Sequence, residues 1–375
     1  MLARILLICV LSLLSTLAAF CQSAPQVAPL PDNPLELASS SVQTAETPEK
    51  RAAVLELIER ARQNTDLHGL SSAPFIIKVS FDSSGQVQRT GSGQLEEVWL
   101  SGQTYRWMAR IGDYWQVRLA NKGRIYDQRP SGLIPLRLRM LRTAVFWPIH
   151  NPTTRASLRT AEADWKGAKV TCVLLSGPYR DPNPPSSRRW EETEYCINQK
   201  TGLLQIYSEA PGIYTVYDYT NALQFHGHVL PSQITVAEGS NTVLTAHVES
   251  IDDGSKVDPE TLKPTDQMQT QGPEPVLTPP LRFPQIVNAP SGSSTPAVQP
   301  VIVHVVIGDE GKVLDAEVLP GGNPALEQSA LDLVKASAYP QPRQQNGSQL
   351  EAFINVKFVS GTSKPAQGGG RQPGR

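Results

Sequence analysis

Hydrophobic and polar residues alternate in short segments over most of the chain between residues 74 and 251. Period-two alternation predicts β-strands, and Gly, Ser, Asp or Asn residues separate each segment from the next. The predicted strands cover residues 74–81, 93–100, 105–111, 114–120, 123–128, 169–176, 190–198, 203–209, 213–219, 223–228, 231–236 and 243–251. About a dozen consecutive strands of this kind predict one large, strongly curved antiparallel sheet with the shape of a half-barrel.

Two segments, one before this region and one within it, have a different pattern and predict helices that cover the sheet. Residues 48–69 carry apolar residues three and four apart, which is helical spacing: Ala53, Val54, Leu57, Ile58 and Ala61. Residues 133–149 form an apolar stretch that also carries Arg137, Arg139 and Arg142. We expect this stretch to be a second covering helix.

The segment of residues 301–359 predicts the order strand, turn, strand, helix, strand. β-Branched residues from Val301 to Ile307 lead into a Gly-Asp-Glu-Gly turn and a second alternating strand. Asn323 is a favourable N-cap and Pro324 a favourable first residue for the helix that follows. A final strand carries its alternate residues at Ala352, Ile354, Val356 and Phe358. The predicted unit is ββαβ.

Residues from about 280 to 360 resemble the C-terminal domain of the TonB family, the periplasmic energy transducers of Gram-negative bacteria. The matching parts are the hairpin VIGDEGKVLDAEVL, the helix NPALEQSALDLVKA with the proline after it, and the NG turn before a strand ending in VKFV. The family's usual aromatic-basic-aromatic run before the proline is replaced by Ser337-Ala338-Tyr339. The resemblance implies that the last strand, through Ala352, Ile354, Val356 and Phe358, pairs its edge with an extended peptide of an outer-membrane partner. An unrelated ββαβ domain is the alternative.

The middle region resembles the LolA-like family, periplasmic half-barrels that hold lipid or lipoprotein acyl chains. The supporting parts are the leading helix followed by PFIIKVSF, the meander GSGQLEEVWLSGQTYRWMARIGDYWQVRL, and FHGHVLPSQITV. The resemblance implies a ligand cavity, which Trp99, Trp107 and Trp115 would line. Aromatic core packing and an unrelated meander are the alternatives.

These patterns together predict an α+β fold. A half-barrel-like domain with one or two covering helices is followed by a small TonB-like ββαβ domain. The predicted parts are a signal peptide at 1–21, a disordered segment at 22–47, the LolA-like domain at 48–257, a Pro-rich linker at 258–300, the TonB-like domain at 301–360 and a disordered tail at 361–375.

The first 20 residues predict export from the cytoplasm. The apolar run that begins at Ile5 is shorter than the ~20 residues that span a bilayer, so we interpret it as a cleaved signal sequence. The predicted location is the periplasm or cell envelope. A retained leader is the alternative, and only a retained leader would permit energy transduction.

Two cysteines outside the leader, Cys172 and Cys196, predict a disulfide. They lie on strand-like segments that flank a loop rich in Pro and Ser. In an antiparallel hairpin the numbers of opposed residues have a constant sum. If Cys172 and Cys196 are opposed, the centre of the hairpin is Pro184, in the middle of that loop. In an oxidising compartment such a pair forms a disulfide. Two buried free thiols are the alternative.

Composition and motifs predict a protein that is not an enzyme and binds no cofactor, metal or nucleic acid. Lys and Arg total 34 against 35 Asp and Glu, so no excess positive charge is available for phosphates. No nucleophile elbow, metalloprotease helix or phosphate-binding loop occurs. Glu192 and Glu194 are expected to face solvent from one strand face, and His226 and His228 share a strand face without an evident third ligand.

The sequence therefore predicts a non-catalytic envelope adaptor that binds an outer-membrane transporter or another envelope protein through its C-terminal domain. The alternative function is a carrier of lipid or lipoprotein acyl chains that acts through the middle domain. A metal-dependent hydrolase built around His226 and His228 is the third hypothesis.

Overall fold

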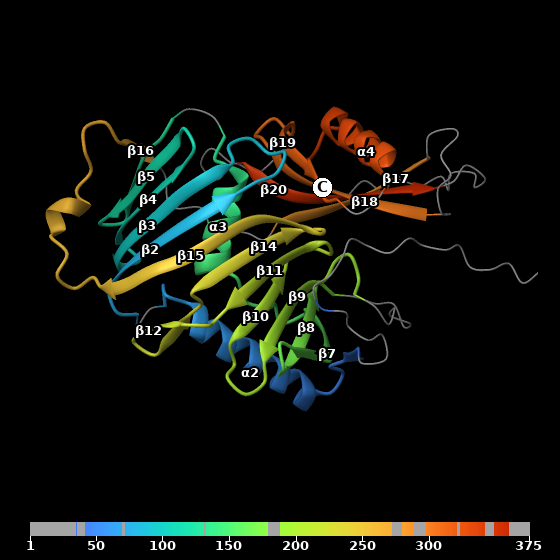
Figure 1. Cartoon of the computed structure of the whole chain (residues 1–375), viewed down its shortest axis with the longest axis horizontal. Helices are drawn as coiled ribbons and strands as arrows, with labels where there is room; N and C mark the ends of the chain where they lie inside the picture. The colour runs from blue at the N-terminus through green and yellow to red at the C-terminus, as the bar shows by residue number, and fades with distance from the viewer. Residues whose placement is uncertain are drawn as a thin grey trace, which may run out of the picture. The chain divides into compact units, whose positions relative to one another are not determined.

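The computed structural model describes residues 35, 42–69, 72–130, 133–178, 188–271, 280–288, 298–320, 323–341 and 349–359 (Figure 1). Several sequence predictions lie outside these residues. They are the signal peptide at 1–21, most of the disordered segment at 22–47, the loop centre at Pro184, the turn at Asn346-Gly347 and the tail at 361–375.

One antiparallel sheet of fourteen strands makes up most of the molecule, in the order β1-β7-β8-β9-β10-β11-β14-β15-β2-β3-β4-β5-β6-β16. Its first half along the chain consists of β1 (Gln43–Thr44), β2 (Phe75–Ser83), β3 (Gly91–Ser101), β4 (Thr104–Ile111), β5 (Tyr114–Asn121), β6 (Arg124–Gln128) and β7 (Ser157–Trp165). The second half consists of β8 (Ala168–Ser176), β9 (Thr193–Asn198), β10 (Leu204–Ser208), β11 (Ile213–Asp218), β14 (Gln233–Glu238), β15 (Asn241–Asp253) and β16 (Gln269–Gln271).

Most of the predicted strands are confirmed. Their residues alternate because one face of the sheet packs on the core. Phe75, Ile77 and Val79 of β2 are buried, whereas Lys78 between them is exposed. The strand predicted at 223–228 instead splits into β12 (Leu223–Phe225) and β13 (His228–Leu230), which pair as a separate hairpin. β7 was not among the predicted strands.

Both predicted covering helices are present and pack on one face of the sheet, which we call the inner face. The N-cap residue of α2 (Pro48–Thr65) is Thr47, and α2 buries Val54, Ile58 and Ala61. The second helix, α3 (Leu136–Phe146), lies behind β2 and β15 in Figure 1. Apolar side chains of both helices and of the sheet form one core cluster. The opposite face is the outer face.

The C-terminal part has the predicted ββαβ order. It consists of β18 (Val298–Ile307), β19 (Val313–Val318), α4 (Pro324–Ala336) and β20 (Leu350–Val359). Asn323 caps α4, its side chain accepting a hydrogen bond from the backbone N–H of Ala325 at 3.0 Å. A preceding strand, β17 (Leu281–Asn288), completes a four-stranded sheet in the order β17-β20-β18-β19.

The position of β20 differs from the prediction that it offers a free edge. β17 and β18 flank β20 on its two sides. Ala352, Ile354, Val356 and Phe358 therefore lie on an interior strand, and Ala352, Ile354 and Val356 are fully buried. A strand with neighbours on both sides has no unpaired backbone groups with which to bind an extended peptide.

The predicted α+β class with a separate TonB-like domain is wrong. Strands dominate the fold, and the helices of eight or more residues in the described regions are α2, α3 and α4. Residues Leu30–Gln285 and Val301–Val356 form one compact unit. Ile302, Val306, Leu319 and Phe353 belong to the same core cluster as the large sheet. The C-terminal segment, defined here as Val301–Val356, is thus part of a mostly β body.

The predicted linker at 258–300 contains regular structure in its described parts. A short 3₁₀ helix, η2 (Pro259–Leu262), is followed by β16 and β17. Leu262 is buried against Val98 and Leu119 on the outer face. Within the described residues, no helix has the length and apolar character needed to cross a membrane.

Candidate functional site

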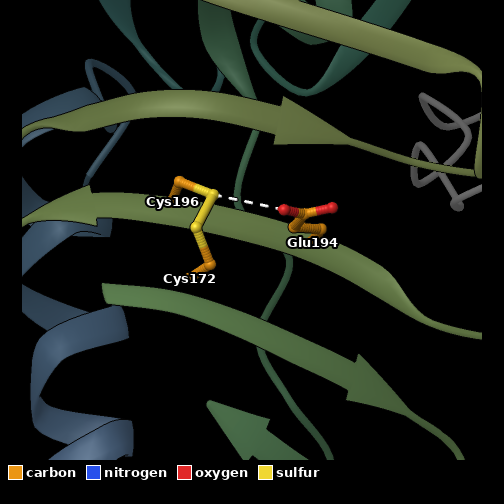
Figure 2. A group of neighbouring side chains, drawn as sticks. All are labelled: Cys172, Glu194 and Cys196. Carbon is orange, nitrogen blue, oxygen red and sulfur yellow. Dashed lines mark hydrogen bonds between the residues drawn. A yellow bond between two sulfur atoms is a disulfide. The ribbon is translucent and has the colours of Figure 1, made fainter. Parts of the chain in front are cut away.

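The predicted disulfide between Cys172 and Cys196 is confirmed. The two residues are directly opposed on β8 and β9, and their sulfur atoms are bonded (Figure 2). Both side chains are fully buried on the outer face, in a small cluster with Val170, Ile206 and Tyr214. The register has the constant sum expected of an antiparallel hairpin, which is why residue numbers alone located the pair.

Glu194 lies beside this disulfide and is fully buried. Its Oε1 atom is 3.3 Å from the Cys196 sulfur, the contact drawn as a dashed line in Figure 2. A disulfide sulfur carries no hydrogen, so a hydrogen bond here requires a proton on the carboxyl group. Burial raises the pKa of Glu194, against the charge of Arg188, whose Nη1 donates to Oε2 at 3.0 Å.

These residues do not form a metal site. Among the described residues, Cys172, Glu194 and Cys196 are the group of His, Cys, Asp or Glu side chains whose ligand atoms converge. Both sulfurs are already bonded to each other, whereas a metal requires thiolates. His226 does not share a strand face with His228 as predicted, because His226 lies with Gly227 in the turn between β12 and β13.

The expectation that Glu192 and Glu194 face solvent is wrong, since both side chains are fully buried. Glu192 accepts hydrogen bonds from Arg159 at 2.6 Å and forms an ion pair with Arg189 at 2.9 Å. A buried carboxylate needs such partners. The adjacent arginines in SSRRWEETEY could have indicated that these glutamates are buried in ion pairs.

The three tryptophans predicted to line one cavity are divided between the two faces of the sheet. Trp99 and Trp107 are buried on the inner face, where Trp99 stacks on Phe75 and the guanidinium of Arg142 lies 4.0 Å from the Trp107 ring centre. Trp115 is opposite Arg110 on the neighbouring strand, which places it on the outer face. Trp99 and Trp107 therefore belong to the packed core, whereas Trp115 lies outside it.

Trp115 lines a groove of about 530 Å³ on the outer face of β2, β3, β4 and β5. Met108 and Val117, directly opposed on β4 and β5, supply apolar side chains beside it. Lys78 and Arg110 lie among the polar residues of the lining. The volume is within the range of roughly 300–1,000 Å³ that is usual for small-molecule sites.

A second constellation, which the sequence analysis did not predict, is a group of buried charges. We call it the charge cluster, and its members are Arg137 of α3, Glu238 of β14, His304 of β18, Glu317 of β19 and Glu351 of β20. Arg137, Glu238 and His304 are fully buried. The cluster joins the C-terminal segment to α3 and to the large sheet.

Arg137 holds two carboxylates of this cluster at once. Its Nη1 donates to Glu238 Oε1 at 3.0 Å, its Nη2 donates to Glu317, and its Nε donates to the carbonyl oxygen of Ser84 at 2.9 Å. Gly239 follows Glu238 with φ of 58°, and a Cβ there would overlap the carbonyl oxygen of Pro320. Glycine therefore permits the close approach of the β14–β15 turn to the end of β19.

His304 donates from both ring nitrogens to carboxylates. Nδ1 is 2.8 Å from Glu238 Oε1 and Nε2 is 2.7 Å from Glu351 Oε1. Neutral imidazole has one N–H, so two carboxylate acceptors favour the imidazolium ion. Burial alone would lower the pKa of His304, but the hydrogen bonds to Glu238 and Glu351 outweigh it and raise the pKa to about 9.

The two carboxyl groups that share Arg137 have pKa values displaced in opposite directions. Burial would raise the pKa of Glu238, but the hydrogen bond from His304 and the charge of Arg137 lower it to about 2. Burial and the charge of Glu238 raise the pKa of Glu317 to about 7, with Arg137 opposing the shift. Glu317 and Glu238 also line a polar pocket of about 460 Å³.

Comparison with known proteins gives similar folds at low similarity. A LolA superfamily protein from Nitrosomonas europaea is 13% identical over 56% of this chain and 96% of its own, with a TM-score of 0.34. A putative outer membrane lipoprotein-sorting protein domain from Vibrio parahaemolyticus is 8% identical over 56% and 95%, also with a TM-score of 0.34. The MucA/MucB complex structure of Pseudomonas aeruginosa is 11% identical over 81% and 93%, with a TM-score of 0.26.

No family model and no curated protein sequence matches the chain. The resemblance to the TonB C-terminal domain has no support from these comparisons. The similar solved structures include LolA-superfamily and lipoprotein-sorting-like folds.

Proposed function

We propose that this chain is a non-catalytic protein of the cell envelope that binds an apolar chain, such as a lipid acyl chain, in the outer-face groove. The observation that carries the proposal is the groove of about 530 Å³ with Met108, Trp115 and Val117 in its lining. This function is the one that the sequence analysis named as its alternative, but it uses the opposite face of the sheet from Trp99 and Trp107.

The groove continues an apolar stripe that is covered elsewhere on the same face. Val98 and Leu119 are buried there beneath Leu262 of η2. Met108 and Val117 lie on the same face and are only half-buried. Apolar side chains left partly open next to a covered stripe favour an apolar ligand, because covering them removes apolar surface from water.

Two further observations support the rest of the proposal. The described groove lining includes no histidine that could act as a base for Ser80, whose hydroxyl instead donates to the exposed Glu249. The buried disulfide fits an oxidising compartment such as the periplasm, in agreement with the predicted signal sequence. An adaptor acting through a free edge of β20 is not proposed, because β20 has neighbours on both sides.

Replacing Val117 by lysine should weaken binding of a palmitoyl chain while leaving the fold intact. Val117 is half-buried on the outer face, so the longer side chain can keep its ammonium group in water when the groove is empty. An acyl chain in the groove would have to desolvate that charge, and we expect the affinity to fall at least about tenfold. Fluorescence polarisation with a labelled palmitoyl probe measures the dissociation constant.

The matched control is Ile286→Lys, which places the same charge at an apolar residue that is 73% exposed and does not line the groove. It should bind like the wild type. The proposal is wrong if the wild type neither binds the probe nor retains lipid detectable by mass spectrometry after purification. It is also wrong if Val117→Lys binds with the wild-type affinity.

A further inference from the structure

The C-terminal segment is attached to the rest of the body by both apolar and charged contacts. Ile302, Val306 and Phe353 supply the apolar contacts, within the common core cluster. The charged contacts are those of the charge cluster, in which His304, Glu317 and Glu351 come from the segment. Apolar packing is insensitive to pH, whereas the charged contacts depend on the protonation of each group.

The groups that face one another at this junction come from six elements. They are Arg137 and Arg139 of α3, Glu238 of β14, His304 of β18, Asp315 and Glu317 of β19, Glu327 of α4, and Glu351 of β20. Carboxyl groups outnumber cations in this set. Each deprotonation therefore adds to an excess of negative charge among largely buried groups, where like charges repel strongly.

We propose that the charge cluster is a pH-sensitive clasp, which loosens the C-terminal segment from α3 and the large sheet as Glu317 and then His304 lose their protons. The proposal concerns the junction and is independent of ligand binding in the groove. Ionised Glu317 lies beside the Glu238 carboxylate and must share one guanidinium with it. Neutral His304 can donate to only one of its two carboxylates, which leaves the other buried without that partner.

Water can reach the group that titrates first. Glu317 is 6% exposed and lines the polar pocket of about 460 Å³, together with Ser84, Gly85 and Thr242. The backbone N–H of Gln86 donates to Glu317 Oε1 at 2.8 Å, so the carboxyl group stays in place when it changes its charge. Proton exchange at Glu317 therefore does not need prior unfolding of the segment.

The direction of the pH effect follows from the pKa shifts. The pKa values of Glu317 and His304 are raised, from 4.5 to about 7 and from 6.5 to about 9, so the stability each contributes is present at low pH and is lost as pH rises through the raised value. The lowered pKa of Glu238 acts oppositely, and only below about 4.5. Between pH 6 and 9 the closed form should therefore weaken as pH rises.

Hydrogen exchange of the full chain, measured by mass spectrometry from pH 6 to 8, tests the clasp. Protection factors, corrected for the intrinsic exchange rate at each pH, compare peptides of β18 and β19 with peptides of the disulfide-bonded β8–β9 hairpin. Between pH 6 and 8 the opening constant of β18 and β19 should rise about tenfold from Glu317 alone, with up to about a further twentyfold from His304. The reference hairpin should stay protected.

Glu317→Gln keeps the shape of the neutral carboxyl group and should remove the tenfold part of the rise. Glu310→Gln is the matched control, since Glu310 lies in the turn that leads into β19 and is exposed, and it should behave like the wild type. The wild-type profile alone is decisive if Glu317→Gln does not fold. Three results would each overturn the clasp: protection of β18 and β19 that does not change with pH, an equal loss in the reference hairpin, or a wild-type profile in Glu317→Gln.

Discussion

Replacing Arg137 by methionine should lower the free energy of unfolding by about 3–5 kcal/mol, the usual cost of breaking a buried ion pair from one side. Arg137 is fully buried and is the guanidinium shared by Glu238 and Glu317. Methionine fills much of the same volume but donates no hydrogen bond. Two carboxyl groups and the carbonyl oxygen of Ser84 would lose their shared donor.

Arg139→Met is the matched control on the same helix. The side chain of Arg139 is 22% exposed and its nitrogen lies 3.7 Å from Glu351, so its removal should cost at most about 1 kcal/mol. Urea unfolding followed by circular dichroism at pH 6 measures both variants. Equal losses of unfolding free energy in Arg137→Met and Arg139→Met would show that the pairing of Arg137 with two carboxyl groups does not add to stability.

Removing the disulfide should have the second-largest effect, a loss of about 3 kcal/mol in Cys172→Ala/Cys196→Ala. The bond closes a loop between residues 24 apart, and the loss of chain entropy in the unfolded state predicts this magnitude. Alanine avoids placing a hydroxyl group at two fully buried positions. Denaturant unfolding of this variant, beside the oxidised and the reduced wild type, gives the value.

The reduced wild type should unfold close to the double alanine variant, since both lack the cross-link. The buried cysteines lie in the interior of the sheet, where β8 also pairs with β7 and β9 with β10. We therefore expect the native fold to persist after reduction at moderate temperature. A double variant within 1 kcal/mol of the oxidised wild type would contradict the expected contribution of the cross-link.

Local patterns in the sequence predicted those features that depend on neighbouring residues. Alternation located most strands, the spacing of Val54, Ile58 and Ala61 located α2, and the symmetry of one hairpin located the disulfide. Asn323 and Pro324 marked the start of α4. In each case the residues that decide the structure lie within about 25 positions of each other.

The charge cluster was not predicted because its members are far apart in the sequence. Arg137 and Glu317 are 180 residues apart, and each belongs to a segment in which a charge on one face is unremarkable. The alternation from Val313 to Leu319 predicts a mixed face for Asp315 and Glu317, yet both are buried. The groove escaped prediction for a related reason: neighbouring tryptophans of one meander were grouped together although strand parity places Trp107 and Trp115 on opposite faces.

The placement of β20 between β17 and β18 also has a consequence for biogenesis. As the last described strand in the chain, it fills the gap between two strands that precede it. During synthesis, the facing edges of β17 and β18 stay unpaired until residues 350–359 emerge. A chain cut short before residue 350 would expose those edges and lack Glu351. We therefore expect truncated chains, in which this sheet is incomplete, to be more susceptible to proteolysis or self-association than the full-length chain.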